Sequence, residues 1–154
     1  MLNVTGEENL DVYSGQQIDE IYLPEGGAVQ EIESSQPAAP VARTKADRID
    51  IGSRLYSQNC AACHQPEGQG LTGAFPPLAG SDYLLTDTGR AINGVINGIS
   101  GEIIVNGTTY NGVMPAVRLS DEEVANVLTY VLNAWSNDGG EVSPQDVQGV
   151  RSQE

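Results

Sequence analysis

The stretch "NCAACHQ", residues 59–65, holds both cysteines and the single histidine of this 154-residue chain. Thiolate and imidazole are the side-chain groups that bind soft and borderline metal ions best. Cys60, Cys63 and His64 fall within five consecutive positions, and no other residue of these two types occurs in the sequence. The interpretation of the whole chain therefore begins with what this stretch can bind.

Residues 60–64 fit the pattern C-x-x-C-H, which is the attachment signature of c-type haem. At a helix end, this spacing lets two thiols reach the two vinyl groups of one porphyrin and form thioethers. The imidazole of the next residue then falls under the iron as an axial ligand. A covalent haem would also be a large apolar core element, in keeping with an aromatic content of only 5%. We therefore expect one haem c, held by Cys60, Cys63 and His64.

Three other uses of the stretch are weighed against haem. A structural zinc site needs four ligands, usually cysteine and histidine, and the chain has three such residues. A thioredoxin-like redox pair would follow a strand of a parallel sheet, whereas this motif ends a predicted helix and precedes a loop rich in glycine and proline. A plain disulfide or a chance occurrence is the third alternative.

The second axial ligand of such a haem would be methionine or absent, because His64 is the only histidine. Met114 is the only methionine after the first residue, and it lies in "GVMPA" (112–116), in a predicted loop between a hairpin and the last long helix. A lone methionine can also serve as a flexible core residue. A His/Met pair fills both axial positions and raises the reduction potential, which favours electron transfer over gas binding or peroxide chemistry.

The charge of the chain excludes several functions. The formal net charge is -14, and the segment 1–42 carries eight acidic and no basic residues. Such a surface repels phosphate backbones and anionic lipid, so nucleic-acid binding is excluded and a partner with a basic or neutral patch is favoured. No apolar run is long enough to span a membrane. The first ten residues lack the basic and apolar regions of a signal peptide, so we expect a mature chain or a fragment.

Periodicity and turn residues predict the local structure. Helices are expected over 47–59, 82–85 and 88–97, with Leu84, Leu85, Ile92, Val95 and Ile96 facing inward, and residues 64–81 are expected to form a loop. Asn106-Gly107 indicates a hairpin over about 102–111. Ser120 and Glu123 form a predicted capping box for the last long helix. One further turn is expected after Ser143-Pro144.

Residues 46–138 resemble a class I cytochrome c. The resemblance rests on Gly52 and Tyr56, "CAACH" (60–64), "PPL" (76–78), "MP" (114–115) and Tyr130. It implies an all-α fold of three to five helices around one covalent haem, here with a small β-hairpin added. It also implies that the first and last helices cross at Gly52, with Tyr56 packed against Val127 and Tyr130.

The same resemblance implies roles for further residues. A proline carbonyl would accept the ring N–H of His64; Pro76 is the first choice and Pro77 the near alternative. Five side chains, Tyr83, Arg90, Tyr110, Arg118 and Trp135, could contact haem propionates or line the pocket, or else lie on a solvated face.

Residues 4–24, "VTGEENLDVYSGQQIDEIYLP", resemble the closing residues of copper nitrite reductases. Some members of that family continue through a linker into a cytochrome c domain. We therefore interpret residues 1–45 as an acidic tail and linker and residues 46–154 as a cytochrome c domain. The histidine-rich copper sites of that family have no counterpart upstream here, so no copper is expected in this chain.

Three functions follow as hypotheses. The first is a tethered periplasmic electron donor to a cupredoxin-type copper domain that reduces nitrite to nitric oxide, itself supplied by an upstream electron donor. In this reading Tyr13 and Tyr22 either dock onto the copper protein or lie in a tail. The second is a free-standing cytochrome c, or a cytochrome subunit of another oxidoreductase. The third is a haem sensor of nitric oxide or carbon monoxide.

Overall fold

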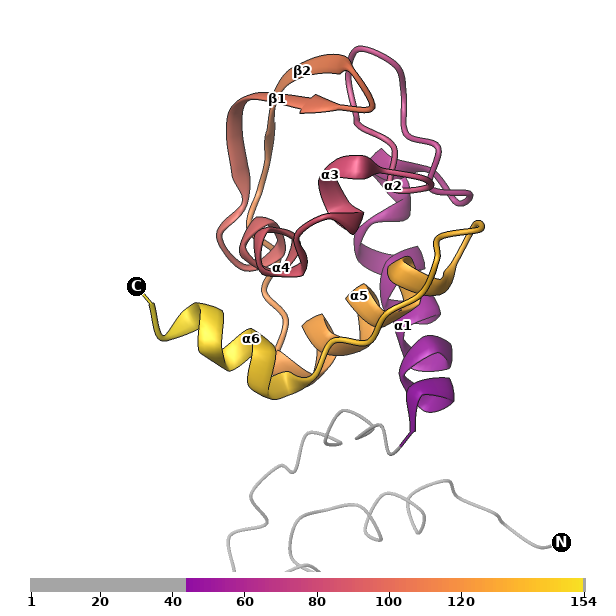
Figure 1. Ribbon diagram of the computed structural model, residues 1–154, viewed down its shortest axis with the longest axis vertical. Helices are drawn as coiled ribbons and strands as arrows, with labels where there is room; N and C mark the ends of the chain where they lie inside the picture. Colours follow the sequence, from indigo (N-terminus) through magenta and orange to yellow (C-terminus); the bar gives the residue numbers. More distant parts are fainter. Residues whose placement is uncertain (1–43, 154) are drawn as a thin grey trace, which may run out of the picture. The chain divides into compact units, whose positions relative to one another are not determined.

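The computed structural model describes residues 44–153, so the predictions made for the acidic segment 1–42 lie outside the described residues. The described part is mainly helical and contains one two-stranded antiparallel sheet (Figure 1). Its elements are α1 (Lys45–Asn59), α2 (Ala61–His64), α3 (Asp82–Leu85), α4 (Thr88–Asn97), β1 (Ile99–Val105), β2 (Thr108–Met114), α5 (Asp121–Asn133) and α6 (Pro144–Arg151). No helix among these residues is both long and apolar enough to cross a membrane.

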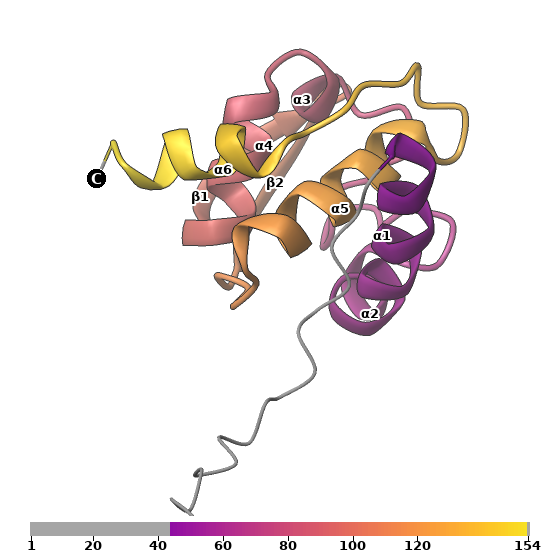
Figure 2. The same ribbon diagram turned by 90° about the horizontal axis from the view of Figure 1, so that it is seen from below.

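Helices α1 and α5 lie side by side, as Figure 2 shows, and form the most extensive helix contact of the described residues. Each begins with a capping box: Thr44 with Asp47 in α1, and Ser120 with Glu123 in α5. The two helices touch at Gly52, which is buried. A Cβ atom at this position would stand 2.1 Å from the backbone oxygen of Asn126. The predicted close crossing at Gly52 is therefore present.

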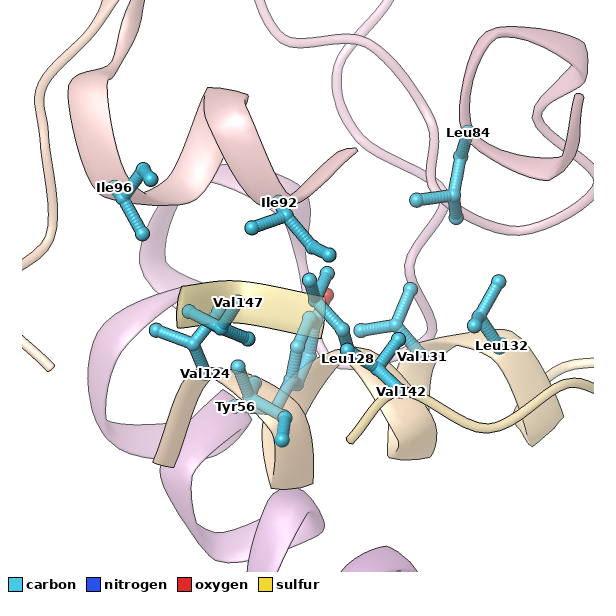
Figure 3. Close-up of a cluster of buried hydrophobic side chains, with 12 residues drawn as sticks. Tyr56, Leu84, Ile92, Ile96, Val124, Leu128, Val131, Leu132, Val142 and Val147 are labelled. Carbon is cyan, nitrogen blue, oxygen red and sulfur yellow. The ribbon is translucent and has the colours of Figure 1, made fainter. Parts of the chain in front are cut away.

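The apolar core lies between α5 and the elements that surround it (Figure 3). Helix α5 is buried along most of its length because apolar or small side chains fill nearly every position from 124 to 132. Helix α4 contributes Ile92 and Ile96, and α1 contributes Tyr56. The fully or almost fully buried apolar side chains are Tyr56, Leu84, Ile92, Ile96, Val124, Ala125, Val127, Leu128, Val131, Leu132, Val142 and Val147.

The hairpin is longer than predicted. Strands β1 and β2 pair from Ile99 opposite Met114 to Val105 opposite Thr108. The turn is Asn106-Gly107, as predicted, and both residues have positive φ, at 50° and 76°. Met114 is thus the last residue of a strand and not part of a loop. Its side chain is fixed in direction by the pleat of β2, which is a correction to the sequence-based expectation.

The turn of the hairpin is fastened to α3. The backbone N–H of Asp82 donates to the side-chain oxygen of Asn106 at 3.0 Å, and the backbone N–H of Asn106 donates to the Asp82 carboxylate at 2.7 Å. These reciprocal hydrogen bonds join positions 24 residues apart. They hold the hairpin against the same side of the molecule as the loop that leads into α3.

Two further expectations were wrong. Leu85 is 39% exposed, because α3 is a single turn and only Leu84 faces the core. The segment after Ser143 forms a helix of eight residues, α6, and not one turn. Its capping box, Ser143 with Asp146, and the complete burial of Val147 stabilise it. The sequence pattern is weak here because only two apolar side chains, Val147 and Val150, face the core.

Candidate haem-binding site

The C-x-x-C-H stretch sits where α1 turns into α2. Cys60 ends α1 and begins α2, and the backbone N–H of His64 donates to the Cys60 carbonyl at 2.9 Å. Cys60 is half-buried and Cys63 is exposed, and neither forms a disulfide. Burial and the neighbouring Cys63 raise the pKa of the Cys60 thiol to about 11. Both cysteines border one cavity, so their thiols are placed to react with a single group bound in it.

His64 is buried and its ring is held in one orientation. Its Nδ1 lies 3.0 Å from the carbonyl oxygen of Pro76, so the geometry selects Pro76 over Pro77. When Nδ1 donates this hydrogen bond, Nε2 is left free to bind a metal ion. Burial lowers the pKa of His64, and the bond to Pro76 partly opposes this effect. The neutral, ligand-competent form of the imidazole is therefore favoured.

The loop 65–81 is folded tightly enough to place the Pro76 carbonyl. The backbone N–H of Gly70 donates to the His64 carbonyl at 2.9 Å, and that of Leu78 donates to the Gly68 carbonyl at 2.7 Å. Gly70 has a φ of +63°, and a Cβ there would meet the Phe75 carbonyl oxygen at 2.4 Å. This close approach of two backbone segments requires glycine.

An apolar cavity separates α2 from the hairpin and from α4 and α5. It is bordered by the two cysteines, His64 and Met114, and residues from the loop 74–81, from α3, α4 and α5 and from both strands of the hairpin complete its wall. Apart from the four named residues, the wall includes Ala74, Phe75, Pro76, Pro77, Leu78, Ser81, Tyr83, Leu84, Arg90, Ala91, Gly94, Val95, Ile99, Gly101, Ile103, Val105, Tyr110, Gly112, Val113, Pro115, Val127, Leu128 and Val131. The structure thus brings all four predicted ligand residues to one cavity.

The family model described as cytochrome c matches residues 49–135, more than half of the chain. The chain belongs to the cytochrome c family. Membership implies a haem c and a function in electron transfer for this cytochrome.

Its relatives are cytochromes and cytochrome subunits. Over 91 residues, 56% of this chain and 69% of the relative, it is 46% identical to cytochrome c-552 of Thermus thermophilus. It is 34% identical over 113 residues to the cytochrome c subunit of a quinone alcohol dehydrogenase of Gluconobacter oxydans, covering 70% of this chain and 23% of that subunit. It is 34% identical over 114 residues to the cbb3-type cytochrome c oxidase subunit CcoP of Rubrivivax gelatinosus, covering 72% of this chain and 34% of that protein.

The residues of this cytochrome fit a haem. Among residues 44–153, no group of three or more Cys, His, Asp or Glu side chains is arranged to hold a metal ion. His64 Nε2 and the Met114 thioether suit iron whose other ligands come from a porphyrin. The apolar wall suits the macrocycle, and the two free thiols suit its vinyl groups.

The guanidinium group of Arg90, which lines the cavity, also suits a haem. Arg90 stacks over the ring of Tyr83 at 3.9 Å and donates to the Tyr83 carbonyl and to Thr86 Oγ1. Its buried Nε has no hydrogen-bond partner in the structure. A buried N–H without a partner is costly, so an acceptor in the cavity, such as a haem carboxylate, would satisfy it.

The five side chains left open by the sequence divide into two groups. Tyr83, Arg90 and Tyr110 line the cavity, whereas Arg118 and Trp135 do not. Trp135 packs instead against Tyr56 and Tyr130, with ring centroids 5.0 and 5.6 Å away. Its position after α5 could not be assigned from spacing because the chain leaves the helix there with a positive φ.

Sequence reasoning missed the contribution of β1 to the wall. Alternate residues of β1, from Ile99 through Gly101 and Ile103 to Val105, line the cavity. On the paired strand, Tyr110, Gly112 and Met114 do so as well, together with Val113. The alternation of β1 was the available signal, since residues two apart lie on one face of a strand.

Proposed function

We propose that this cytochrome carries single electrons through one haem c, held covalently by Cys60 and Cys63 and ligated by His64 and Met114. The observation that carries the proposal is that all four side chains border the same apolar cavity. When bound, the haem supplies reversible one-electron chemistry at iron. The protein holds His64 through the Pro76 carbonyl and presents Met114 at the end of β2.

Two properties of the wall suit electron transfer. Apolar side chains exclude water, which limits solvent reorganisation when the charge changes. If His64 and Met114 both bound the iron, gas binding and peroxide chemistry would be disfavoured. The proposal is tested by producing the chain with haem-attachment machinery in a bacterial periplasm, the compartment in which we place it. A mass increase by one haem and a reversible one-electron redox titration are expected; unmodified thiols or rapid carbon monoxide binding would contradict it.

We further propose that the electron acceptor is the copper site of a nitrite reductase. Support comes from the resemblance of residues 4–24, and these residues lie outside the described part. The alternative acceptor is another oxidoreductase, which the relatives among dehydrogenase and oxidase subunits favour.

Stopped-flow mixing separates these two acceptors. The reduced full chain is mixed with a copper nitrite reductase that lacks its own haem domain. Replacing Tyr13 and Tyr22 with alanine should slow the transfer, while phenylalanine at both positions should preserve it. Equal electron-transfer rates for the alanine and phenylalanine double variants would show that these tyrosines have no docking role. If the wild-type chain transferred no electrons to the copper protein, the alternative acceptor would be favoured.

The rim of the cavity predicts how the partner docks. The segments 69–81 and 103–117 contribute many of the residues that line the cavity, and they contain no Asp, Glu, Lys or Arg. Leu71 and Val113 in these segments are 56% and 74% exposed. Without charges at the contact, steering is weak, so the second-order transfer rate should change less than about threefold between low and physiological ionic strength. A steep dependence would place the docking surface on the acidic part of the molecule.

A further inference from the structure

We propose that Gly98 is a positioning residue for Met114. Because Gly98 has no side chain, the backbone of residues 114–116 can pack directly against the C-terminal end of α4. This contact sets how far the methionine sulfur reaches into the cavity. The inference rests on the proposed ligation of iron by Met114. Gly98 does not line the cavity and would act only through the backbone.

The evidence is a direct contact between two backbone segments. Gly98 caps α4 with φ 80° and ψ 177°, a conformation that is essentially restricted to glycine. A Cβ atom at this position would lie 2.5 Å from the carbonyl oxygen of Met114 and 2.9 Å from the backbone nitrogen of Ala116. Both atoms belong to the main chain, so no change of side-chain rotamer could relieve the overlap.

A second contact fastens the same segment to α4. The backbone N–H of Val117 donates to the Val95 carbonyl at 2.9 Å. The helix itself is anchored in the core by Ile92 and Ile96, which are 2% and 7% exposed. The segment after β2 is therefore supported twice by an element that cannot easily shift.

Displacement of this segment has a measurable consequence. An external ligand such as imidazole can bind iron only when Met114 is released, so its apparent affinity rises in proportion to the released fraction. Gly98→Ala must push the 114–116 backbone away from α4 and so weaken the bond to sulfur. We expect imidazole to bind the oxidised holoprotein about tenfold more tightly than it binds the wild type. The weak charge-transfer band of iron–methionine bonding should weaken in parallel.

Gly73→Ala is the matched control. Gly73 has a φ of +79°, almost equal to that of Gly98, but a Cβ there would meet no atom within 4 Å. The Gly73→Ala variant therefore places alanine at an equally unfavourable φ without any overlap with neighbouring atoms. Its imidazole affinity and its charge-transfer band should equal those of the wild type. Equal imidazole affinities in the Gly98→Ala and Gly73→Ala proteins would overturn the proposal.

Val117→Pro keeps the proposal testable if Gly98→Ala yields no folded holoprotein. Proline removes the N–H that bonds to Val95 and adds no atom at Gly98, and an increase of about threefold in imidazole affinity is expected, in keeping with one lost hydrogen bond. An unchanged affinity in this variant would count against positioning by α4. A wild type that already binds imidazole as readily as Met114→Ala would refute the ligand role of Met114, and not the contact at Gly98.

Discussion

Replacing Met114 with alanine is expected to lower the reduction potential by on the order of 0.1 V and to open the iron to external ligands. The reason is that Met114 is the only methionine among residues 44–153 and borders the cavity, and that a thioether ligand raises the potential of a His-ligated haem. The iron–sulfur charge-transfer band should vanish, and carbon monoxide should bind the reduced form. Potentiometry and visible spectroscopy of the wild type and the variant provide the measurement.

Two other substitutions at the same position control for packing. Met114→Leu preserves the volume of the side chain and removes the sulfur, so it should behave like Met114→Ala. Met114→His returns a ligand and should restore a low-spin haem at a potential below that of the wild type. A Met114→Leu protein with the potential and spectrum of the wild type would show that iron takes its second ligand elsewhere.

Gly52→Ala is expected to destabilise the holoprotein by about 3 kcal/mol, a large share of the stability of a domain of this size. The added Cβ would stand 2.1 Å from the Asn126 oxygen and 2.7 Å from the Tyr130 Cβ, so α1 and α5 must move apart. Asn126 and its neighbours on α5 are almost wholly buried, which leaves no room for a local adjustment. Because Cys60 ends α1, the separation would also displace the haem attachment site. Denaturant unfolding followed by circular dichroism gives the free energy.

Gly149→Ala is the matched control for Gly52→Ala. Gly149 also lies inside a helix, α6, but a Cβ there would meet nothing within 4 Å. Alanine should therefore stabilise the protein by about 0.5–1 kcal/mol through helix propensity alone. A Gly52→Ala protein as stable as the wild type would contradict the close crossing of α1 and α5.

Features of the fold that depend on local signals were predictable from the sequence. The capping box at Ser120 and the Asn106-Gly107 turn lie where expected because their hydrogen bonds and φ angles involve only neighbouring residues. The crossing at Gly52 followed from the family resemblance and is present. The C-x-x-C-H pattern likewise placed Cys60, Cys63 and His64 beside one cavity.

Features that depend on contacts between distant segments were not predictable. The family resemblance ranked Pro76 above Pro77 and the structure agrees, but the residue pattern alone does not separate two adjacent prolines; the folding of the loop around Gly70 places the Pro76 carbonyl at His64. Leu85 belongs to an apolar pair, but a single helical turn can bury only one of the two side chains. The contact of Gly98 with the Met114 backbone joins positions 16 apart, and the sequence around neither residue indicates it.

The central claim, ligation by Met114, is tested most directly by nuclear magnetic resonance of the reduced holoprotein labelled at its methionine methyl groups. The sequence contains two methionines, so two methyl signals are expected. The account predicts that one signal lies far upfield, shifted by the haem ring, and that this signal is the one missing from Met114→Leu. Two methyl signals at ordinary positions, in a protein that carries covalent haem, would contradict it.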